Sequence, residues 1–229
     1  MNNLDFSNLD NDLDKKGYAF LPDIRNEIDT DEFANSISAE MKESSFIENA
    51  KNHKKLLQNI SYYDDLKNYL YSKAKKEFNY RSSDKEYLVS RKVEAGDMKE
   101  MYRAHFDSHL YTLVIPIKIP FSKVSAGELI FFPNLRNNPS SELSNLITKT
   151  YFKRYASKKG VESLSKKAEM KINNFFDYKP ILFRGNTFLH TNKGVAKDAT
   201  SYRLTCLSHF FDPYENFGIG KLLRILRRR

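Results

Sequence analysis

The chain has one cysteine and no long apolar run among its 229 residues. With Cys206 alone, neither a disulfide framework nor a thiolate zinc cluster can form within the chain. No stretch approaches the roughly 18 consecutive apolar residues of a transmembrane helix. The acidic N-terminus, "MNNLDFSNLDNDLDKK", also lacks the apolar segment of a secretory signal, so we expect a cytoplasmic protein.

Composition and charge indicate a folded protein with a basic surface. Apolar residues make up 40% of the chain and aromatic residues 14%, and the length suits one core, so we predict a single domain over residues 1–229. Residues 1–32 carry nine acidic and three basic side chains, whereas the whole chain has a net charge of +9. The basic remainder either keeps the chain soluble or indicates an anionic partner: a phosphate, an acidic sugar, nucleic acid or a membrane surface.

The first third of the chain predicts helices and one short strand. The strand is expected over residues 15–24. A helix should follow Asp29, which is spaced with Glu32 as a capping box, and a second helix should cover residues 62–78, where apolar residues recur every four positions. His53 lies between these helices in a Lys-rich segment that we expect to be a loop. The two helices would cover one face of a sheet.

From residue 86 onward the chain consists of short β-branched or aromatic segments separated by Gly, Pro, Asn or Asp. They are "EYLVSRKV", "YRAHFD", "LYTLVIPIKIP", "GELIFFPN", "PILFRG", "TFLHTN" and "YRLTCLSHFFD". Pro116 and Pro120 indicate that the third segment is an edge strand or a bent one. Helices followed by a block of strands predict an α+β chain, mainly β in its core, built as a sandwich or a barrel.

Residues 134–179 interrupt the series of strands and read as a helical insertion. This segment holds ten Lys or Arg against four Asp or Glu. Long insertions between strands are usually surface elements, and they often carry binding residues.

Titratable side chains open the longest apolar segment, "YRAHFDSHLYTLVIPIKIP". His105 and Asp107 alternate there, so on a strand they would point to the same face. One imidazole and one carboxylate are two of the three ligands of the facial triad that binds non-haem Fe(II) and leaves coordination positions open. His109 is too close in line to complete such a triad, and we expect it to line the pocket beside the metal.

The third ligand should be a histidine from a distant strand. His190 and His209 both lie in strand-like segments, and His190 is favoured because Arg203 follows it by thirteen residues. An arginine inside an apolar strand needs an anionic partner. A carboxylate of a co-substrate on the metal would be one, and Thr205 faces the same way as Arg203.

These segments resemble those of the Fe(II)/2-oxoglutarate-dependent dioxygenases, in particular the prolyl hydroxylases and the phytanoyl-CoA-hydroxylase-like enzymes. "LVSRKVEAGDMKEMYRAHFD" resembles their strand, glycine turn and HxD stretch, and "GELIFFPN" resembles their Gly-x-Leu-x-Phe-x-Pro strand. "ILFRGNTFLHTNKGV" resembles the segment with the distal histidine, and "ATSYRLTCLSHFFD" resembles the strand with the oxoglutarate-binding arginine. "KKGYAFLPDI" is similar to the family's opening strand.

The resemblance implies a double-stranded β-helix (jelly roll) with N-terminal supporting helices and a helical insertion. It implies Fe(II) on His105, Asp107 and His190, with 2-oxoglutarate on the metal and its far carboxylate on Arg203 and Thr205. With O₂, such an enzyme converts 2-oxoglutarate to succinate and CO₂ and hydroxylates an unactivated C–H bond. The Asp107 carboxylate favours hydroxylation over halogenation.

Two departures from the family pattern bear on its ligands. Prolyl hydroxylases often have an oxoglutarate-contacting Tyr where this chain has Val93, and Tyr102 can take that role only if the strand bends. The second arginine that marks nucleic-acid demethylases has no counterpart after Arg203, which argues against a nucleic-acid substrate.

The insertion lies between the "FFP" strand and the distal-His strand, where it could cover the iron. We expect its basic side chains to face an anionic substrate, with His109 and Arg184 as further substrate contacts, unless the insertion is only a solvated surface. The candidate substrates are a phosphorylated or acidic sugar, an acyl thioester, or an acidic protein segment, which would make the chain a protein side-chain hydroxylase. The basic residues concerned are Lys149, Lys153, Arg154, Lys158 and Lys159.

The last segment, residues 218–229, reads "GIGKLLRILRRR" and has the pattern of a basic amphipathic helix. Such a segment either lies at an anionic membrane surface or packs its apolar face on the domain. Together with the insertion, it favours a lipid-linked substrate such as a Kdo-type sugar acid of a lipopolysaccharide core, and a peripheral position on the inner face of the membrane. The competing class is a non-catalytic jelly-roll protein that has kept a metal or ligand site.

Overall fold

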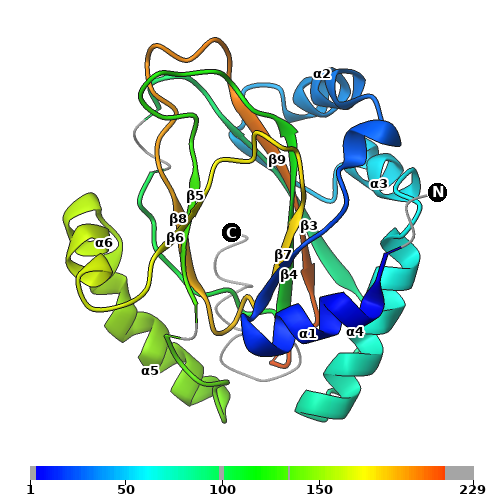
Figure 1. Cartoon of the computed structure of the whole chain (residues 1–229), viewed down its shortest axis with the longest axis vertical. Helices are drawn as coiled ribbons and strands as arrows, with labels where there is room; N and C mark the ends of the chain where they lie inside the picture. The colour runs from blue at the N-terminus through cyan, green and yellow to red at the C-terminus, as the bar shows by residue number, and fades with distance from the viewer. Residues whose placement is uncertain (1–3, 98–100, 134, 215–229) are drawn as a thin grey trace.

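A computed structural model describes residues 4–97, 101–133 and 135–214, and its centre is a pair of antiparallel sheets (Figure 1). The larger sheet has the strand order β1-β7-β4-β9-β3-β2 and the smaller one β6-β5-β8. The strands are β1 (Tyr18–Phe20), β2 (Phe46–Glu48), β3 (Glu86–Val93), β4 (Tyr111–Lys118), β5 (Leu129–Phe132), β6 (Lys171–Asn173), β7 (Ile181–Phe183), β8 (Leu189–Asn192) and β9 (Arg203–Phe210). The α+β class and the jelly-roll core predicted from the sequence are confirmed.

Helices cover the outer faces of both sheets (Figure 1). The first four lie on the larger sheet, and the two helices of the insertion lie outside the smaller one. The helices are α1 (Phe6–Lys15), α2 (Thr30–Met41), α3 (Lys51–Gln58), α4 (Tyr63–Phe78), α5 (Glu142–Phe152) and α6 (Lys158–Ser165), with short 3₁₀ turns η1 (Ile24–Asn26) and η2 (Lys153–Tyr155). Because burial of apolar area is the main driving force of folding, these layers stabilise the sheets from outside.

Apolar side chains pack in three places that follow from this layering. Leu66 and Leu70 of α4 belong to the cluster between the helices and the larger sheet. Val161 of α6 belongs to the cluster outside the smaller sheet. Val114 and Phe131, one from each sheet, belong to the cluster between the sheets. Residues of β4 and β9 therefore alternate between a helix-facing side and a side that faces the smaller sheet.

Several elements agree with the sequence predictions. Asp29 is the N-cap of α2, and its carboxylate accepts hydrogen bonds at 3.0 Å from the backbone N–H groups of Asp31 and Glu32. The helix expected over residues 62–78 is α4, and the strand expected over residues 15–24 contains β1.

Three expectations about local structure are wrong. His53 lies in helix α3 instead of a loop, because its ring packs in the core with Nδ1 3.2 Å from Ser90 Oγ. Residues 102–107 do not form a strand; His105 makes only an isolated bridge to His190. The insertion is not helical throughout, because its β6 pairs with β5 and extends the smaller sheet.

The two prolines of the long apolar segment do not place it at a sheet edge. β4 lies between β7 and β9, so Pro116 belongs to a central strand. It is tolerated because the pairing with β7 ends at Val114 and the register with β9 shifts between Pro116 and Lys118. The alternative expectation, a bent strand, agrees with this irregularity.

Candidate metal centre

Three side chains from separate segments converge on one point. His105 and Asp107 lie in the irregular segment before β4, and His190 lies in β8. One ligand atom from each lies within 4.8 Å of the other two. The Nε2 atoms of His105 and His190 are each 3.6 Å from an oxygen of the Asp107 carboxylate. Asp107 and His190 are buried, whereas the His105 side chain is 50% exposed, so the group is open on the His105 side.

Backbone hydrogen bonds hold these ligands together. His105 and His190 exchange both of their backbone hydrogen bonds at 3.0 Å, and Asp107 N–H donates to the Gly185 carbonyl at 3.0 Å. The segment with His105 and Asp107 is therefore fixed to β8 and to the turn before it. This pairing brings the three side chains together without a regular strand at residues 102–107.

The imidazoles are oriented as metal ligands. His105 Nδ1 lies 2.7 Å from the Arg103 carbonyl and His190 Nδ1 lies 3.2 Å from the Phe188 carbonyl, so each Nδ1–H can donate there and leave Nε2 for a metal. Desolvation by the surrounding protein, followed by the charge of His190, lowers the pKa of His105 to about 4. The ring is therefore neutral at pH 7, as a metal ligand must be.

The Asp107 carboxylate is held in its ionised form. Burial opposes its charge, but three neighbouring imidazoles and the hydroxyl of Thr112 outweigh burial and lower its pKa. Thr112 Oγ1 donates to Asp107 Oδ2 at 2.6 Å. His209 Nδ1 is 3.1 Å from the same hydroxyl and, because the hydroxyl proton goes to Asp107, the histidine donates to the hydroxyl oxygen.

Gly185 leaves room for this hydrogen-bonded pair. A Cβ added at Gly185 would lie 2.5 Å from Thr112 Oγ1 and 3.0 Å from Asp107 Oδ2. Any side chain there would displace the hydroxyl or the carboxylate. Two imidazoles that present Nε2 and one ionised carboxylate are the donor set that non-haem Fe(II) takes, so these residues fit that metal.

Arg203 and Thr205 lie on the face of β9 that includes Leu207, which packs between the two sheets. Arg203 is buried, and its Nη1 donates to the Gly127 carbonyl. Its Nε has no hydrogen-bond partner among the described residues. Burial, followed by repulsion from Arg91, lowers the pKa of Arg203 to about 9, which still leaves it charged at neutral pH. A buried cation with an unused donor calls for an anion.

A cleft of about 840 Å³ opens beside His105. Its walls include Arg91 of β3, Arg103, Lys149 of α5 and Lys153 of η2. Sites for small organic ligands typically have volumes of roughly 300–1,000 Å³. The structure therefore places part of the basic insertion in the wall of a cleft that reaches His105 of the metal group.

The remaining predicted site residues lie around this cleft or away from it. Tyr102 has a positive φ of 54° and packs partly buried against the cluster outside the smaller sheet, where burial raises its pKa. His109 stacks on Tyr87 with ring centroids 5.9 Å apart and lies 5.2 Å from the His209 ring. Roles for Tyr102 in 2-oxoglutarate binding and for His109 in substrate binding stay predictions.

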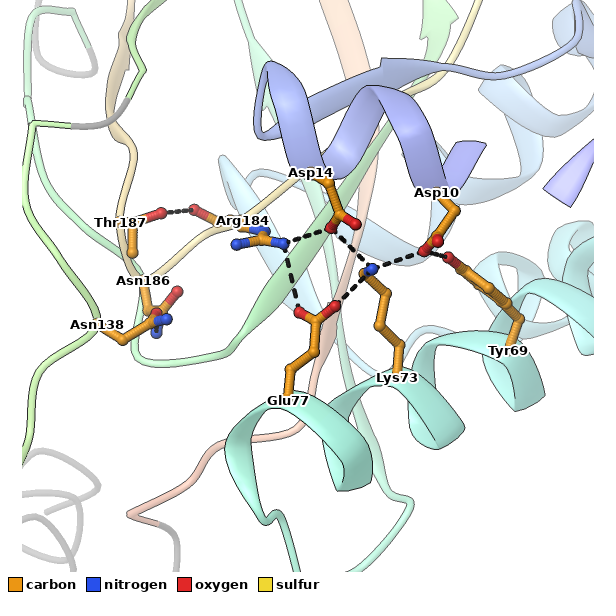
Figure 2. Close-up of polar contacts among 9 residues, drawn as sticks. All are labelled: Asp10, Asp14, Tyr69, Lys73, Glu77, Asn138, Arg184, Asn186 and Thr187. Atoms are coloured by element: carbon orange, nitrogen blue, oxygen red, sulfur yellow. Dashed lines mark hydrogen bonds and ion pairs between the residues drawn. The ribbon is translucent and has the colours of Figure 1, made fainter. Parts of the chain in front are cut away.

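Arg154 and Arg184 make contacts outside the cleft. The Arg154 guanidinium lies over the Tyr151 ring at 3.8 Å from its centroid and also over Tyr155. Arg184 pairs with Asp14 at 2.9 Å and with Glu77 at 3.3 Å (Figure 2). Both carboxylates also contact the buried Lys73 of α4, and this network joins α1 and α4 to the turn that carries Gly185. Substrate contacts of Arg154 and Arg184 stay predictions.

Four residues of the site were not singled out from the sequence. Thr112 and Gly185 support Asp107, and Arg91 and Arg103 line the cleft. Strand alternation in "EYLVSRKV" predicts which residues share a face with Arg91, but only the β3–β9 register of the structure puts Arg91 opposite Thr205. Gly185 had no local signal, because its close approach to Thr112 and Asp107 joins segments distant in the sequence. Thr112 and Arg103 lie only five and two residues from Asp107 and His105, but the segment between them is not a regular strand, so alternation could not predict their contacts.

No protein-family model matches the chain, and no curated protein sequence matches it. Solved structures match it over most of its length. A prolyl-4-hydroxylase from Pseudomonas putida has a TM-score of 0.51 at 11% identity and covers 90% of this chain and 98% of that chain. The non-haem α-ketoglutarate-dependent epimerase SnoN from nogalamycin biosynthesis has a TM-score of 0.53 at 10% identity and covers 90% and 82%.

HygX from Streptomyces hygroscopicus, solved with iron bound, gives a TM-score of 0.52 at 9% identity and covers 89% of this chain and 85% of that chain. At such identities the likeness establishes a shared fold. The chain has the jelly-roll fold of the iron- and 2-oxoglutarate-dependent oxygenases, as its motifs predict.

Proposed function

We propose that the chain is an Fe(II)- and 2-oxoglutarate-dependent hydroxylase. The observation that carries this proposal is the convergence of His105, Asp107 and His190 within 4.8 Å in a chain with the fold of such oxygenases. These three residues would hold the metal. When bound, Fe(II) supplies the electrons that activate O₂ and provides a template for both substrates.

Arg203 and Thr205 are the residues assigned to 2-oxoglutarate. A guanidinium matches a carboxylate with two parallel hydrogen bonds, and the unused Nε of Arg203 supports this assignment. The overall reaction is R–H + 2-oxoglutarate + O₂ → R–OH + succinate + CO₂. Thr112 and His209 would keep the Asp107 carboxylate oriented and ionised during this reaction, so that it stays available as a metal ligand.

An anaerobic titration tests this assignment. Fe(II) and 2-oxoglutarate added to the folded protein should give the weak visible metal-to-ligand charge-transfer band. His105→Ala and Asp107→Ala should abolish the band, and Arg203→Ala should mainly weaken 2-oxoglutarate binding. A folded, metal-loaded protein without the band would rule the assignment out.

A non-catalytic jelly-roll protein that has kept its metal site is the alternative. Succinate formation from 2-oxoglutarate under air, without added substrate, separates the two classes. The uncoupled reaction should be measurable for the wild type and lost in Asp107→Ala. A protein that binds Fe(II) and 2-oxoglutarate but forms no succinate would be the binding protein.

For the substrate we propose an anionic molecule presented at a membrane, such as a Kdo-type sugar acid of a lipopolysaccharide core. The basic cleft beside His105 supports the anionic character. Membrane presentation is supported by α5, which exposes Leu143, Ile147 and Tyr151 along one stripe, 58%, 61% and 52% exposed, with Lys153 directly after the helix. An acidic protein segment remains the second candidate substrate.

Cosedimentation with anionic vesicles at low and high salt tests the membrane proposal. Salt-sensitive binding that is lost in Leu143→Ser/Ile147→Ser or on deletion of residues 221–229 would support it, and no binding at low salt would refute it. The predicted basic tail, residues 218–229, lies outside the described residues. Among the described helices none is long and apolar enough to cross a membrane. A peripheral position on the inner face is part of the same proposal.

A further inference from the structure

The cleft beside His105 collects positive charge from four separate positions. Arg91 comes from β3, Arg103 lies two residues before His105, and Lys149 and Lys153 come from the insertion. Among the described residues that line the cleft there is no Asp or Glu. The walls between the cations are apolar, with Phe106, Phe152, Phe46 and Leu146 among them.

The fold holds these cations in place. Arg91 is paired in register with Thr205, so its side chain is on the same face of the sheet as Thr205 and Arg203. After burial, the charge of Arg91 is the next cause that lowers the pKa of Arg203, so the two guanidinium groups lie near each other. Lys149 Nζ donates to Ser108 Oγ at 2.9 Å, which fastens α5 to the segment that follows Asp107.

Only some of the basic side chains of the insertion line the cleft. Lys153 lines the cleft, whereas the next residue, Arg154, lies over the rings of Tyr151 and Tyr155. Lys166 and Lys167 are also exposed on the insertion and are not among the residues of the cleft. A uniformly basic surface would not place Lys153 in the cleft and the adjacent Arg154 outside it.

Four cationic side chains that line one space give it a positive potential, which favours an anion as the ligand. A single carboxylate carries one charge. A phosphate monoester carries about −1.5 to −2 at pH 7 and offers three acceptor oxygens, which arginine and lysine bind well. The apolar walls suit an organic group attached to that phosphate.

We propose that this cleft binds the phosphate of a phosphorylated substrate, through Arg91, Arg103, Lys149 and Lys153. The proposal rests on the proposed function, because it places the phosphate-bearing substrate next to the His105, Asp107 and His190 group. It narrows the substrate class from anionic molecules to phosphate esters, so a Kdo-type sugar acid would fit only if the molecule also carries a phosphate group. The phosphate can belong to a soluble molecule or to a lipid headgroup, and both offer the same chemistry to the cleft.

The test uses the Fe(II)- and 2-oxoglutarate-loaded protein without O₂, with phenyl phosphate as the probe and benzoate as the monoanionic comparison, followed by calorimetry. Phenyl phosphate should bind and benzoate should bind at least tenfold more weakly. In Lys149→Gln/Lys153→Gln the phenyl phosphate affinity should fall at least about tenfold, because two charge-assisted contacts are lost. Lys166→Gln/Lys167→Gln removes the same charge from the insertion outside the cleft and should bind like the wild type.

The outcomes separate this proposal from the proposed function. Equal weakening in both double variants, no weakening in either, or equal binding of benzoate would overturn the phosphate site even with the charge-transfer band intact. Phosphate binding without that band would instead count against the hydroxylase. If the double variant unfolds at a lower temperature than the wild type, Lys153→Gln alone replaces it in the test. This single variant should lower the affinity for phenyl phosphate at least about threefold.

Two competition experiments identify the source of the phosphate. Vesicles of phosphatidylcholine with phosphatidic acid should compete with phenyl phosphate if the site takes lipid-borne phosphate. Glucose 6-phosphate should compete if it takes soluble phosphate esters. Competition by either supports the site, and competition by neither overturns it.

Discussion

Replacing Gly185 with alanine tests how closely the fold is built around the Asp107 carboxylate. The added Cβ would lie 2.5 Å from Thr112 Oγ1 and 3.0 Å from Asp107 Oδ2. The φ angle of Gly185 is outside the left-handed region, so alanine suits the backbone itself. Any effect of Gly185→Ala therefore comes from contact with these two side chains.

The size of the effect follows from the contact distances. A separation of 2.5 Å is about 1 Å shorter than a comfortable van der Waals contact. Thr112 must turn away and give up its 2.6 Å hydrogen bond to Asp107. Loss of such a supporting hydrogen bond typically weakens metal binding by about 10–100-fold. Overpacking at a buried site should also lower the free energy of unfolding by about 1–3 kcal/mol.

Anaerobic Fe(II) titration of the wild type, Gly185→Ala and Gly194→Ala measures this directly. Gly194→Ala is the matched control, because the nearest atoms to its Cβ all belong to the Met101 side chain, and the shortest distance, 3.2 Å, is to the flexible Sδ. It should keep the wild-type affinity. Thr112→Ala should weaken Fe(II) binding strongly in the wild type but little in Gly185→Ala, since the same hydrogen bond is already lost. A folded Gly185→Ala protein with Fe(II) affinity within twofold of the wild type would refute the reasoning.

Three other predictions concern the surroundings of the site. Gly127→Ala puts a side chain at a φ of +85°, which strains the backbone, and its Cβ would lie 3.0 Å from Arg203 Nη1. Calorimetry should show that this substitution weakens 2-oxoglutarate binding at least about tenfold and leaves the Fe(II) affinity unchanged. Lys73→Met removes the cation that three carboxylates contact (Figure 2). Urea unfolding should show that the free energy of unfolding falls by roughly 2 kcal/mol. A fall below about 0.5 kcal/mol would contradict a stabilising role of this ion-pair network. Burial lowers the pKa of His53 to about 3, so the unfolded chain takes up a proton below about pH 6.5 that the folded chain does not. The stability this provides is complete above pH 6.5 and is lost as the pH falls toward 3. Between pH 7 and 5 the wild type should lose about 2 kcal/mol more than His53→Gln, and equal slopes in the two proteins would argue against a neutral buried His53.

The sequence by itself determined the elements whose signals are local. A capping side chain and a period of four residues were enough for α2 and α4, because both depend on residues within one or two helical turns. Alternation along β9 put Arg203 and Thr205 on one face for the same reason. The order of HxD, distal His and buried Arg along the chain sufficed to suggest the fold.

Only the tertiary structure decided how these pieces meet. The sequence suggested that alternation on a strand aligns His105 with Asp107, but long-range bonds to His190 and Gly185 hold them instead. Pro116 was compatible with an edge or a bend, and the choice depended on where β7 stops pairing. The supporting hydroxyl of Thr112 and the space left by Gly185 also depend on strand neighbours that no local pattern specifies. Pairing partners are chosen by the packing of the whole sheet, so contacts across it can be read only after the chain has folded.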